Sequence, residues 1–216
     1  KGNDFLGAIG NSLLISVATT SLAVMVGVFT AYALARLNFP GKGVVTGIIL
    51  AASMFPGIAL VTPLFQLFGD LGWIGTYRAM IIPNISFALP LTIYTLVSFF
   101  RQLPWELEEA ARVDGASRGQ AFRLVLLPLA APALFTTAIL AFIATWNEFM
   151  LARQLSTTAT EPVTVAIARF SGPSAFEYPY ASIMAAGALV TVPLIIMVLI
   201  FQRRIVSGLT AGGVKA

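Results

Sequence analysis

Hydrophobic and charged positions alternate along this chain in long blocks. Five stretches contain no Asp, Glu, Lys or Arg: residues 5–35, 43–69, 79–100, 124–147 and 178–202. Each is longer than the roughly 20 apolar residues with which an α-helix crosses about 30 Å of hydrocarbon. The pattern predicts an all-α membrane protein, a polytopic helical bundle to which these 216 residues contribute five spans.

Composition narrows the class of function. Charged residues make up 10% of the chain, against roughly 25% in soluble domains. Cys and His are both absent, which excludes disulfides, thiol or imidazole catalysis and the usual zinc or haem ligands. We therefore expect no catalytic residue and no metal site. Nucleic-acid binding is disfavoured, because a net charge of +4 is typical of a membrane protein that retains Lys and Arg on its cytoplasmic side.

The distribution of basic residues predicts the orientation. When the five spans are threaded in order, nine Lys and Arg residues fall on one side and four on the other. Because cytoplasmic loops carry the excess of Lys and Arg, the protein is expected in the cell membrane with its C-terminus in the cytoplasm and residue 1 outside. A chain that begins outside, on Lys1 and without a signal peptide, leads us to expect a preceding span, which makes six in the full protein.

Prolines and small residues within the spans predict how the helices pack. Proline removes a backbone donor, so we expect kinks at Pro56, Pro63, Pro83, Pro90, Pro132 and Pro193. Gly27, Ala31 and Ala35 recur at helical spacing, which favours close approach of a neighbouring helix.

The segment between the third and fourth spans, residues 101–128, reads RQLPWELEEAARVDGASRGQAFRLVLLP and predicts helix, glycine, helix. Pro104 suits the first turn, and Gly115 suits the left-handed position after the last turn. Ser117 with Gln120 resembles a capping box that opens a second helix up to Pro128. We call residues 101–128 the elbow.

The first helix of the elbow is amphipathic, with apolar side chains at 103, 107, 110 and 113 on one face. Such a helix lies on a membrane surface or docks into a protein cleft. Three Glu residues near its start disfavour an anionic lipid surface and favour a protein partner.

Seven spaced residues of the elbow match a known motif. They fit the EAA motif of ABC import permeases, E-A-A-x3-G-x9-I-x-L-P, at Glu109, Ala110, Ala111, Gly115, Val125, Leu127 and Pro128, with Val125 in place of the usual Ile. AYALARLNFPGKG (31–43), DGASRGQAFRLVLLPL (114–129) and WNEF (146–149) extend the likeness. Over nearly its whole length the chain resembles the sugar-importing permeases of the maltose and trehalose type, which implies a single type I ABC importer permease domain over residues 1–216.

The resemblance also implies partners and site residues. The elbow would be the coupling helix that sits in a groove of a cytoplasmic ATPase, with the coupling residues Glu108, Glu109, Ala110, Ala111, Asp114, Gly115, Leu127 and Pro128. The cytoplasmic C-terminal tail, residues 205–216, would enter the ATPase interface as a flexible strand through Gly208, Leu209, Thr210, Gly212 and Gly213. The partners would be a homologous permease, two ATPase subunits and an extracytoplasmic sugar-binding protein.

Glu148 is the one acid that falls well inside an expected span, which we place at residues 131–152. A carboxylate at that depth needs a partner or a water-filled face, so we expect it to face the protein interior or the substrate pathway. Trp146 and Asn147 beside it would offer a ring face and hydrogen bonds to a sugar. Structural salt-bridging or helix packing explains the three residues equally well.

The chain lacks the phosphate-binding loop G-x4-G-K-[ST], because no glycine lies five residues before its one Gly-Lys pair, Gly41-Lys42. This subunit is therefore expected to bind no cofactor, with ATP and Mg²⁺ on the partner ATPases. The resemblance implies a permease that imports a sugar, such as the disaccharide trehalose or maltose, by alternating access. Two alternatives are a secondary transporter driven by an ion gradient, which Glu148 alone supports poorly, and a membrane scaffold.

Overall fold

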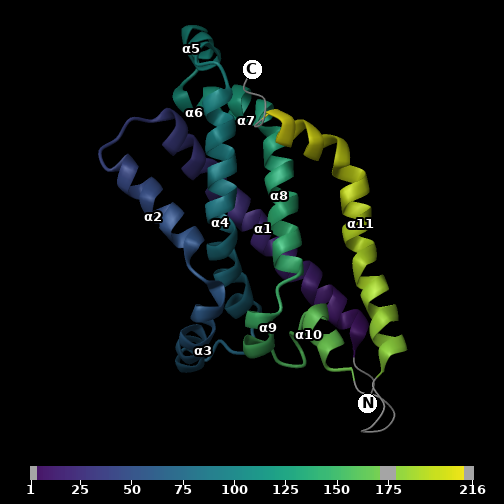
Figure 1. Cartoon of the computed structure of the whole chain (residues 1–216). Coiled ribbons are helices and arrows are strands. Elements are labelled where there is room, and N and C mark those ends of the chain that lie inside the picture. Colours follow the sequence, from purple (N-terminus) through teal and green to yellow (C-terminus); the bar gives the residue numbers. More distant parts are fainter. Residues whose placement is uncertain (1–3, 171–178, 212–216) are drawn as a thin grey trace.

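The polypeptide forms a bundle of long helices with short helices at both ends (Figure 1). The computed structural model describes residues 4–170 and 179–211, with side chains as far as residue 201. All regular structure in these ranges is helical, which confirms the predicted all-α class. Three helices are each long and apolar enough to cross a membrane: α1 (Phe5–Arg36), α4 (Tyr77–Gln102) and α11 (Tyr180–Ala211) over its part Tyr180–Phe201.

Helix α1 is the diagonal member of the bundle. It crosses behind α4 and α8 (Ala131–Trp146) in Figure 1 and packs along both. Its 32 residues extend about 48 Å at 1.5 Å per residue, so it must tilt to fit hydrocarbon of about 30 Å. Gly27 lies where α1 meets α4, and a Cβ there would come within 2.6 Å of Thr92 Cγ2. This contact confirms the close approach expected from the small residues of α1.

The second expected span is not one straight helix. Its residues form α2 (Lys42–Met54) and, after a bend of 89°, the 3-10 turn η1 (Gly57–Leu60) with α3 (Val61–Asp70). Pro56 is the physical reason, because the residue before a proline is driven out of the helical region, and Phe55 is extended at φ −75° and ψ 128°. The kink expected at Pro56 is confirmed, and it divides the expected second span into a bent pair of helices.

The fourth expected span is also shorter than predicted. A bend of 70° separates the helical segment Arg118–Leu129 from α8, and α8 ends at Trp146 instead of continuing to residue 152. A separate short helix, α9 (Met150–Leu155), follows the break. Not every proline interrupts its helix. Pro83 and Pro90 lie within the continuous helix α4, and Pro132 occupies the first turn of α8, where its missing N–H costs no hydrogen bond.

Short helices close the end of the bundle at which α1 begins. These are α3, α9 and α10 (Val163–Ala168), at the bottom of Figure 1. Asn11 of α1 ties this layer together: its Nδ2 donates to the carbonyls of Ala159 and Glu161 at 3.2 and 3.0 Å, and its Oδ1 accepts from the Tyr77 hydroxyl at 2.7 Å. An apolar core packs these short helices against α1 and α4. Its buried residues include Ile15, Phe68, Met80, Leu151, Leu155 and Val165.

The opposite end carries the elbow and the end of α11 (Figure 1). The elbow consists of α5 (Glu106–Val113), α6 (Arg118–Ala121), the π-helix η2 (Phe122–Leu126) and α7 (Leu127–Leu129). Helix α11 continues to Ala211, so residues 208–210 lie on a helix and not on the flexible strand that we expected. Gly212 and Gly213 lie outside the described residues.

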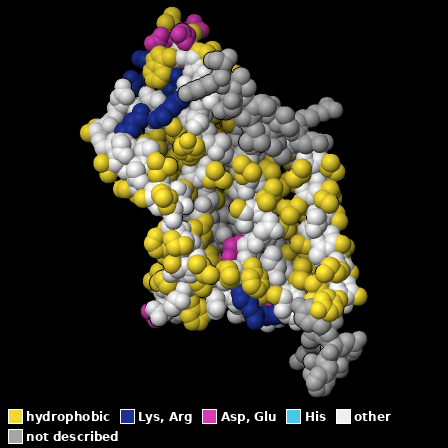
Figure 2. All heavy atoms as spheres, viewed as in Figure 1, with side chains coloured by type: hydrophobic (Ala, Val, Ile, Leu, Met, Phe, Trp, Pro, Cys, Tyr) yellow, Lys and Arg dark blue, Asp and Glu magenta, His cyan; other side chains and the backbone are white. Residues whose placement is uncertain are grey.

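The sides of the bundle are apolar at the surface. Figure 2 shows hydrophobic side chains spread over the flanks of the long helices. The exposed large apolar residues of the chain include Phe29 of α1, Ile48 of α2 and Leu199 of α11. Lys and Arg gather at the elbow end, below acidic side chains at its tip. Contiguous apolar surface of this extent is unusual for a soluble monomer and is the surface that hydrocarbon requires.

Candidate functional site

Helix α5 projects beyond the end of the bundle, at the top of Figure 1. Two local signals, both predicted, end α5 and begin α6. Gly115 has φ +92°, a left-handed conformation that glycine adopts without strain. Ser117 forms a capping box, in which its Oγ accepts from Gln120 N and its own N–H donates to Gln120 Oε1 at 2.8 Å.

The outward face of α5 combines carboxylates with small residues. Glu109, Ala110, Asp114 and Gly115 are exposed, whereas Ala111 is half-buried. Val113, on the predicted apolar face, is 86% exposed. Leu127 is half-buried and Pro128 exposed, further along the elbow. Most of the predicted coupling residues are therefore available to a partner.

Glu108 differs from the other predicted coupling residues, because it faces inward. It is only 6% exposed, and its Oε1 accepts a hydrogen bond of 3.1 Å from the Tyr32 hydroxyl of α1. Its expected place in the ATPase-facing set is therefore corrected: the carboxylate lies between α5 and α1. The heptapeptide AYALARL (31–37) contains Tyr32, but its sequence alone gave no signal for this contact.

Arg36, one turn after Tyr32, holds the start of the elbow. Its Nη2 donates to the Leu103 carbonyl at 2.7 Å, and its guanidinium lies 4.8 Å from the ring centroid of Trp105. A cation over an aromatic face contributes roughly 0.5–2 kcal/mol, more when water is excluded, and Arg36 is only 7% exposed. From the sequence alone, Arg36 was used only as one of the basic residues that predict the orientation of the chain in the membrane.

Aromatic rings join the elbow to the bundle next to these polar contacts. The Tyr32 ring packs 4.5 Å from that of Phe122 and 6.2 Å from that of Phe100, measured between centroids. Phe122 begins the π-helix η2, a rare form found mostly as single turns and often at functional sites. Phe100 is fully buried at the end of α4. We call Tyr32, Arg36, Phe100, Glu108 and Phe122 the elbow node.

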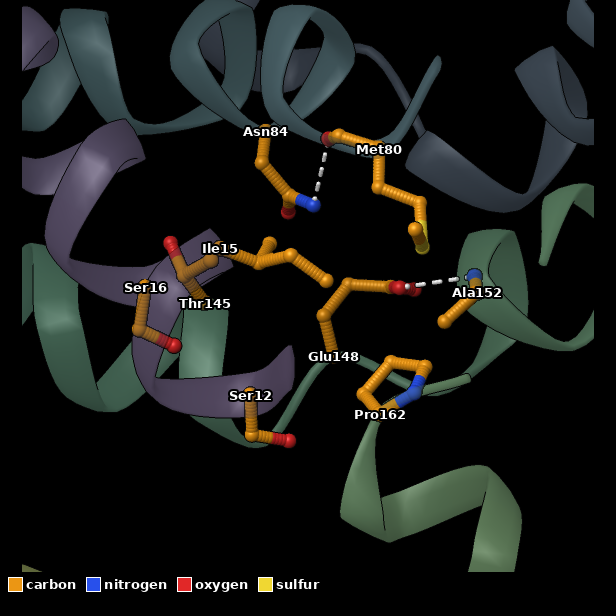
Figure 3. A pocket seen from close by; sticks show the side chains of 9 residues that line it. All are labelled: Ser12, Ile15, Ser16, Met80, Asn84, Thr145, Glu148, Ala152 and Pro162. Carbon is orange, nitrogen blue, oxygen red and sulfur yellow. Dashed lines mark hydrogen bonds between the residues drawn. The ribbon is translucent and has the colours of Figure 1, made fainter. Parts of the chain in front are cut away.

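Glu148 lies in the break between α8 and α9 and not inside a span. Its Oε1 and Oε2 accept the backbone N–H groups of Leu151 and Ala152 at 2.8 and 3.0 Å, which caps the start of α9. The side chain nevertheless faces the interior, as predicted. Figure 3 shows Glu148 entering a pocket of about 10 Å³ from one side and Asn84 of α4 from the other. That volume suits one water molecule.

A larger pocket of about 180 Å³ opens between α4 and α8 and shares Asn84, Thr145 and Glu148 with the small one. Its other lining residues are Phe87, Ala88, Leu91, Thr92, Leu140, Ala141 and Ala144. The Asn84 side chain donates to the Met80 carbonyl at 2.9 Å, and its Oδ1 has no hydrogen-bond partner among the described residues. The shared residues give an otherwise apolar cavity a polar wall.

Two residues of the predicted pathway lie elsewhere. Trp146 is 1% exposed and packs in a core with Ala8, Val163 and Phe142, so its ring is not presented to a sugar. Asn147 is exposed, and its Nδ2 donates to the Ile143 carbonyl at 2.8 Å. Residues that the sequence reading missed, Asn84, Thr92 and Thr145, supply the polar lining instead. The signal was available, since each is a polar position inside an otherwise apolar run.

No group of three or more Asp, Glu, His or Cys side chains that could hold a metal ion occurs within residues 4–170 and 179–211.

Replacement of Glu148 by Ala is expected to lower the thermal unfolding midpoint of the purified protein. The change leaves two backbone donors of α9 without their acceptor, and loss of an N-terminal cap costs about 0.5–2 kcal/mol. Gln154→Ala, at an exposed position of the same helix, is the matched control and should leave the midpoint unchanged. Equal midpoints for Glu148→Ala and the control would contradict the capping role.

Comparisons with known proteins agree with this architecture. Residues 23–210 match the family model described as "Binding-protein-dependent transport system inner membrane component". The trehalose transport system permease SugB of Mycobacterium tuberculosis is 53% identical over the whole chain, which covers 79% of that protein. The trehalose/maltose permease MalG of Thermococcus litoralis is 45% identical over 95% of the chain and 74% of its own length.

Solved structures show the same fold. A bacterial ABC transporter that imports the acidic polysaccharide alginate superposes with a TM-score of 0.77 and 25% identity, over 92% of this chain and 74% of that one. The methionine transporter MetNI gives a TM-score of 0.75 at 18% identity, over 94% and 95% of the two chains. The relatives are named as permeases, which are transport components, so the chain is a transport subunit and not an enzyme, and the secondary-transporter alternative is not favoured. The chain belongs to the inner-membrane permease family of binding-protein-dependent ABC importers.

Proposed function

We propose that this permease carries a sugar, most simply a disaccharide of the trehalose or maltose kind, into the cytoplasm by alternating access. The permeases SugB and MalG, with 53% and 45% identity, support the substrate class. A homologous permease, two ATPase subunits and an extracytoplasmic sugar-binding protein complete the complex. ATP and Mg²⁺ bind to the ATPases.

The exposed face of α5 is the observation that carries the coupling role. Ala110 has no bulk that would prevent seating in a groove, and Glu109 and Asp114 present carboxylates to basic groups of an ATPase. Since the helix projects from the bundle, a partner reaches it without displacing other elements (Figure 1). The elbow end is the cytoplasmic end in this proposal, which also places the end of α11 and the ATPase-contacting tail there.

The pocket between α4 and α8 is the proposed sugar path. Asn84, Thr145 and Glu148 offer hydrogen-bonding groups, and Phe87 adds an aromatic ring to the apolar wall. A few polar groups in a largely apolar cleft are typical of sites for small organic ligands. Its volume of about 180 Å³ is below the roughly 300 Å³ at which such sites begin, so the sister permease would complete the cavity.

Reconstitution tests the function directly. The full complex with its ATPases and binding protein is placed in lipid vesicles, and ATP hydrolysis and uptake are measured across a panel of sugars, amino acids and peptides. We expect stimulation by a disaccharide. Stimulation only by peptides or amino acids would contradict the substrate class, and no stimulation by any solute would contradict the function.

Substitution of Asn84 by Leu is expected to raise the KM for sugar uptake about tenfold. The change removes an amide from the pocket wall, and one hydrogen bond of about 1.4 kcal/mol corresponds to a factor of ten. Ser86→Leu introduces the same residue two positions along α4, at an exposed site outside this pocket, and should leave the KM unchanged. An unaltered KM in Asn84→Leu would remove this pocket from the path.

A further inference from the structure

The attachment of α5 to the bundle is polar where apolar packing would be expected. Of its eight residues, all of which the structure describes, only Glu108 is buried. A helix this short has little stability alone, and Leu107 contributes only a half-buried side chain. Helix α5 packs against α6 and η2 within the elbow, and its one buried side chain, a carboxylate, is hydrogen-bonded to α1.

Helix α1 supplies the groups that hold α5. The Tyr32 hydroxyl donates to Glu108 Oε1 at 3.1 Å in the middle of α5, and Arg36 Nη2 donates to the Leu103 carbonyl at 2.7 Å just before it. Arg36 also lies over Trp105, the residue that precedes α5. Hydrogen bonds that involve an ionised group are roughly twice as strong as neutral ones. Two residues of α1, one turn apart, thus contact the elbow at two points.

Without the contacts of Tyr32 and Arg36, the backbone connections of α5 would transmit force to the bundle poorly. On one side the chain is extended at Leu103, with φ −67° and ψ 133°, and on the other it turns at Gly115. Neither connection continues a helix from α5 into the bundle. By contrast, the rings of Tyr32, Phe100 and Phe122 pack against one another. They connect the hydrogen bond between Tyr32 and Glu108 to α4 and to η2.

We infer that Tyr32 and Arg36 are positioning residues for coupling, which make α5 and the cytoplasmic end of α1 move as one body. A displacement of α5 by an ATPase then turns α1, and α1 packs along both α4 and α8, which line the larger pocket. Force reaches the pocket through a side-chain hydrogen bond as well as through the backbone. The inference rests on the proposed coupling function of the elbow.

The node also holds two polar atoms without partners. Glu108 Oε2 and Arg36 Nε are buried, and neither has a hydrogen-bond partner among the residues that the structure describes. Burial of such groups without a partner costs about 1–3 kcal/mol each, more when the group is charged. Loss of the Tyr32 hydroxyl would leave the Glu108 carboxylate with still fewer partners, so the contact should be sensitive to that change.

The test is Tyr32→Phe in the complete complex, reconstituted with its ATPases and binding protein. The substitution removes one oxygen and preserves the ring packing. We expect sugar uptake per ATP hydrolysed to fall roughly tenfold or more, since a hydrogen bond to a charged group contributes about 1.5–3 kcal/mol and 1.4 kcal/mol corresponds to a factor of ten. Tyr94→Phe, at an exposed position of α4, makes the same chemical change and should leave the ratio unaltered.

Two further readouts separate positioning from stability. Glu108→Gln keeps an oxygen that accepts from Tyr32, and it should retain most of the coupling, whereas Glu108→Ala should behave like Tyr32→Phe. A purely structural role predicts less assembled complex, with uptake and hydrolysis reduced together and their ratio constant, which would overturn the inference. If the wild type and Tyr32→Phe take up the same amount of sugar per ATP hydrolysed, the inference is overturned and the proposed function stands. If sugar does not stimulate ATP hydrolysis even in the wild type, both the inference and the proposed function are overturned.

Discussion

Substitution of Gly115 by Val is expected to leave the permease in the membrane but to uncouple ATP hydrolysis from uptake, with transport per ATP reduced at least about tenfold. Gly115 has φ +92°, where a β-branched residue is strained by roughly 1–3 kcal/mol. A Cβ at this position would meet no atom within 4 Å, so the effect comes from the backbone and not from a clash. Relief of the strain changes the direction in which α5 projects.

Two matched variants isolate that cause. Gly115→Asn should be close to wild type, because Asn tolerates the left-handed region better than other non-glycine residues. Gly119→Val adds the same side chain to the following helix, where φ is negative and the space is open, and should also remain coupled. Membrane insertion and complex assembly are measured alongside uptake and hydrolysis. Normal coupling in Gly115→Val would remove the elbow from the transport mechanism.

The second large effect is expected at the crossing of α1 and α4. Gly27→Ala places a Cβ 2.6 Å from Thr92 Cγ2, and Thr92 is 1% exposed, so the helices must separate or the side chain must shift. Overpacking of this kind costs about 1–3 kcal/mol. We expect a lower thermal unfolding midpoint in detergent and reduced assembly of the complex.

A compensating change tests the geometry of this crossing. Thr92→Ser removes Cγ2, the atom that the new methyl group would meet, so the double variant Gly27→Ala/Thr92→Ser should regain most of the lost stability. Gly10→Ala, on the same helix with nothing within 4 Å of its Cβ, should raise the midpoint slightly, because Ala favours a helix by up to about 1 kcal/mol over Gly. Failure of Thr92→Ser to rescue would mean that another contact limits the approach.

The sequence predicted the long elements well because their signal is simple. Uncharged runs of this length have few stable structures other than membrane-embedded helices, and α1, α4 and α11 follow the predicted runs closely. The elbow was equally accessible, since Gly115 and Ser117 act through backbone conformation and local hydrogen bonds. These residues fix their own neighbourhood and need no tertiary contact.

The features that the sequence did not predict depend on tertiary packing or on which of several prolines breaks its helix. Pro56 breaks its helix while Pro83 and Pro90 do not. The local difference is Gly57 directly after Pro56, since a Pro-Gly pair marks a turn. Trp146 was assigned to the pathway on its chemistry, but a large aromatic side chain is equally stable in a core, where the structure places it. The contact of Tyr32 with Glu108 joins residues 76 positions apart, and pattern reasoning along a single chain does not reach that distance.

The brevity of α8 sets the length of the barrier that a solute must cross. Its 16 residues extend about 24 Å, roughly 6 Å less than the hydrocarbon thickness of a typical bilayer. Irregular backbone at membrane depth is tolerated only where protein or water surrounds it. Of the residues in the break after Trp146, Glu148 lines both pockets, and Asn147 beside it is exposed. A hydrated vestibule can therefore reach into the membrane as far as Glu148, and the dry segment that separates the two aqueous sides is correspondingly thin.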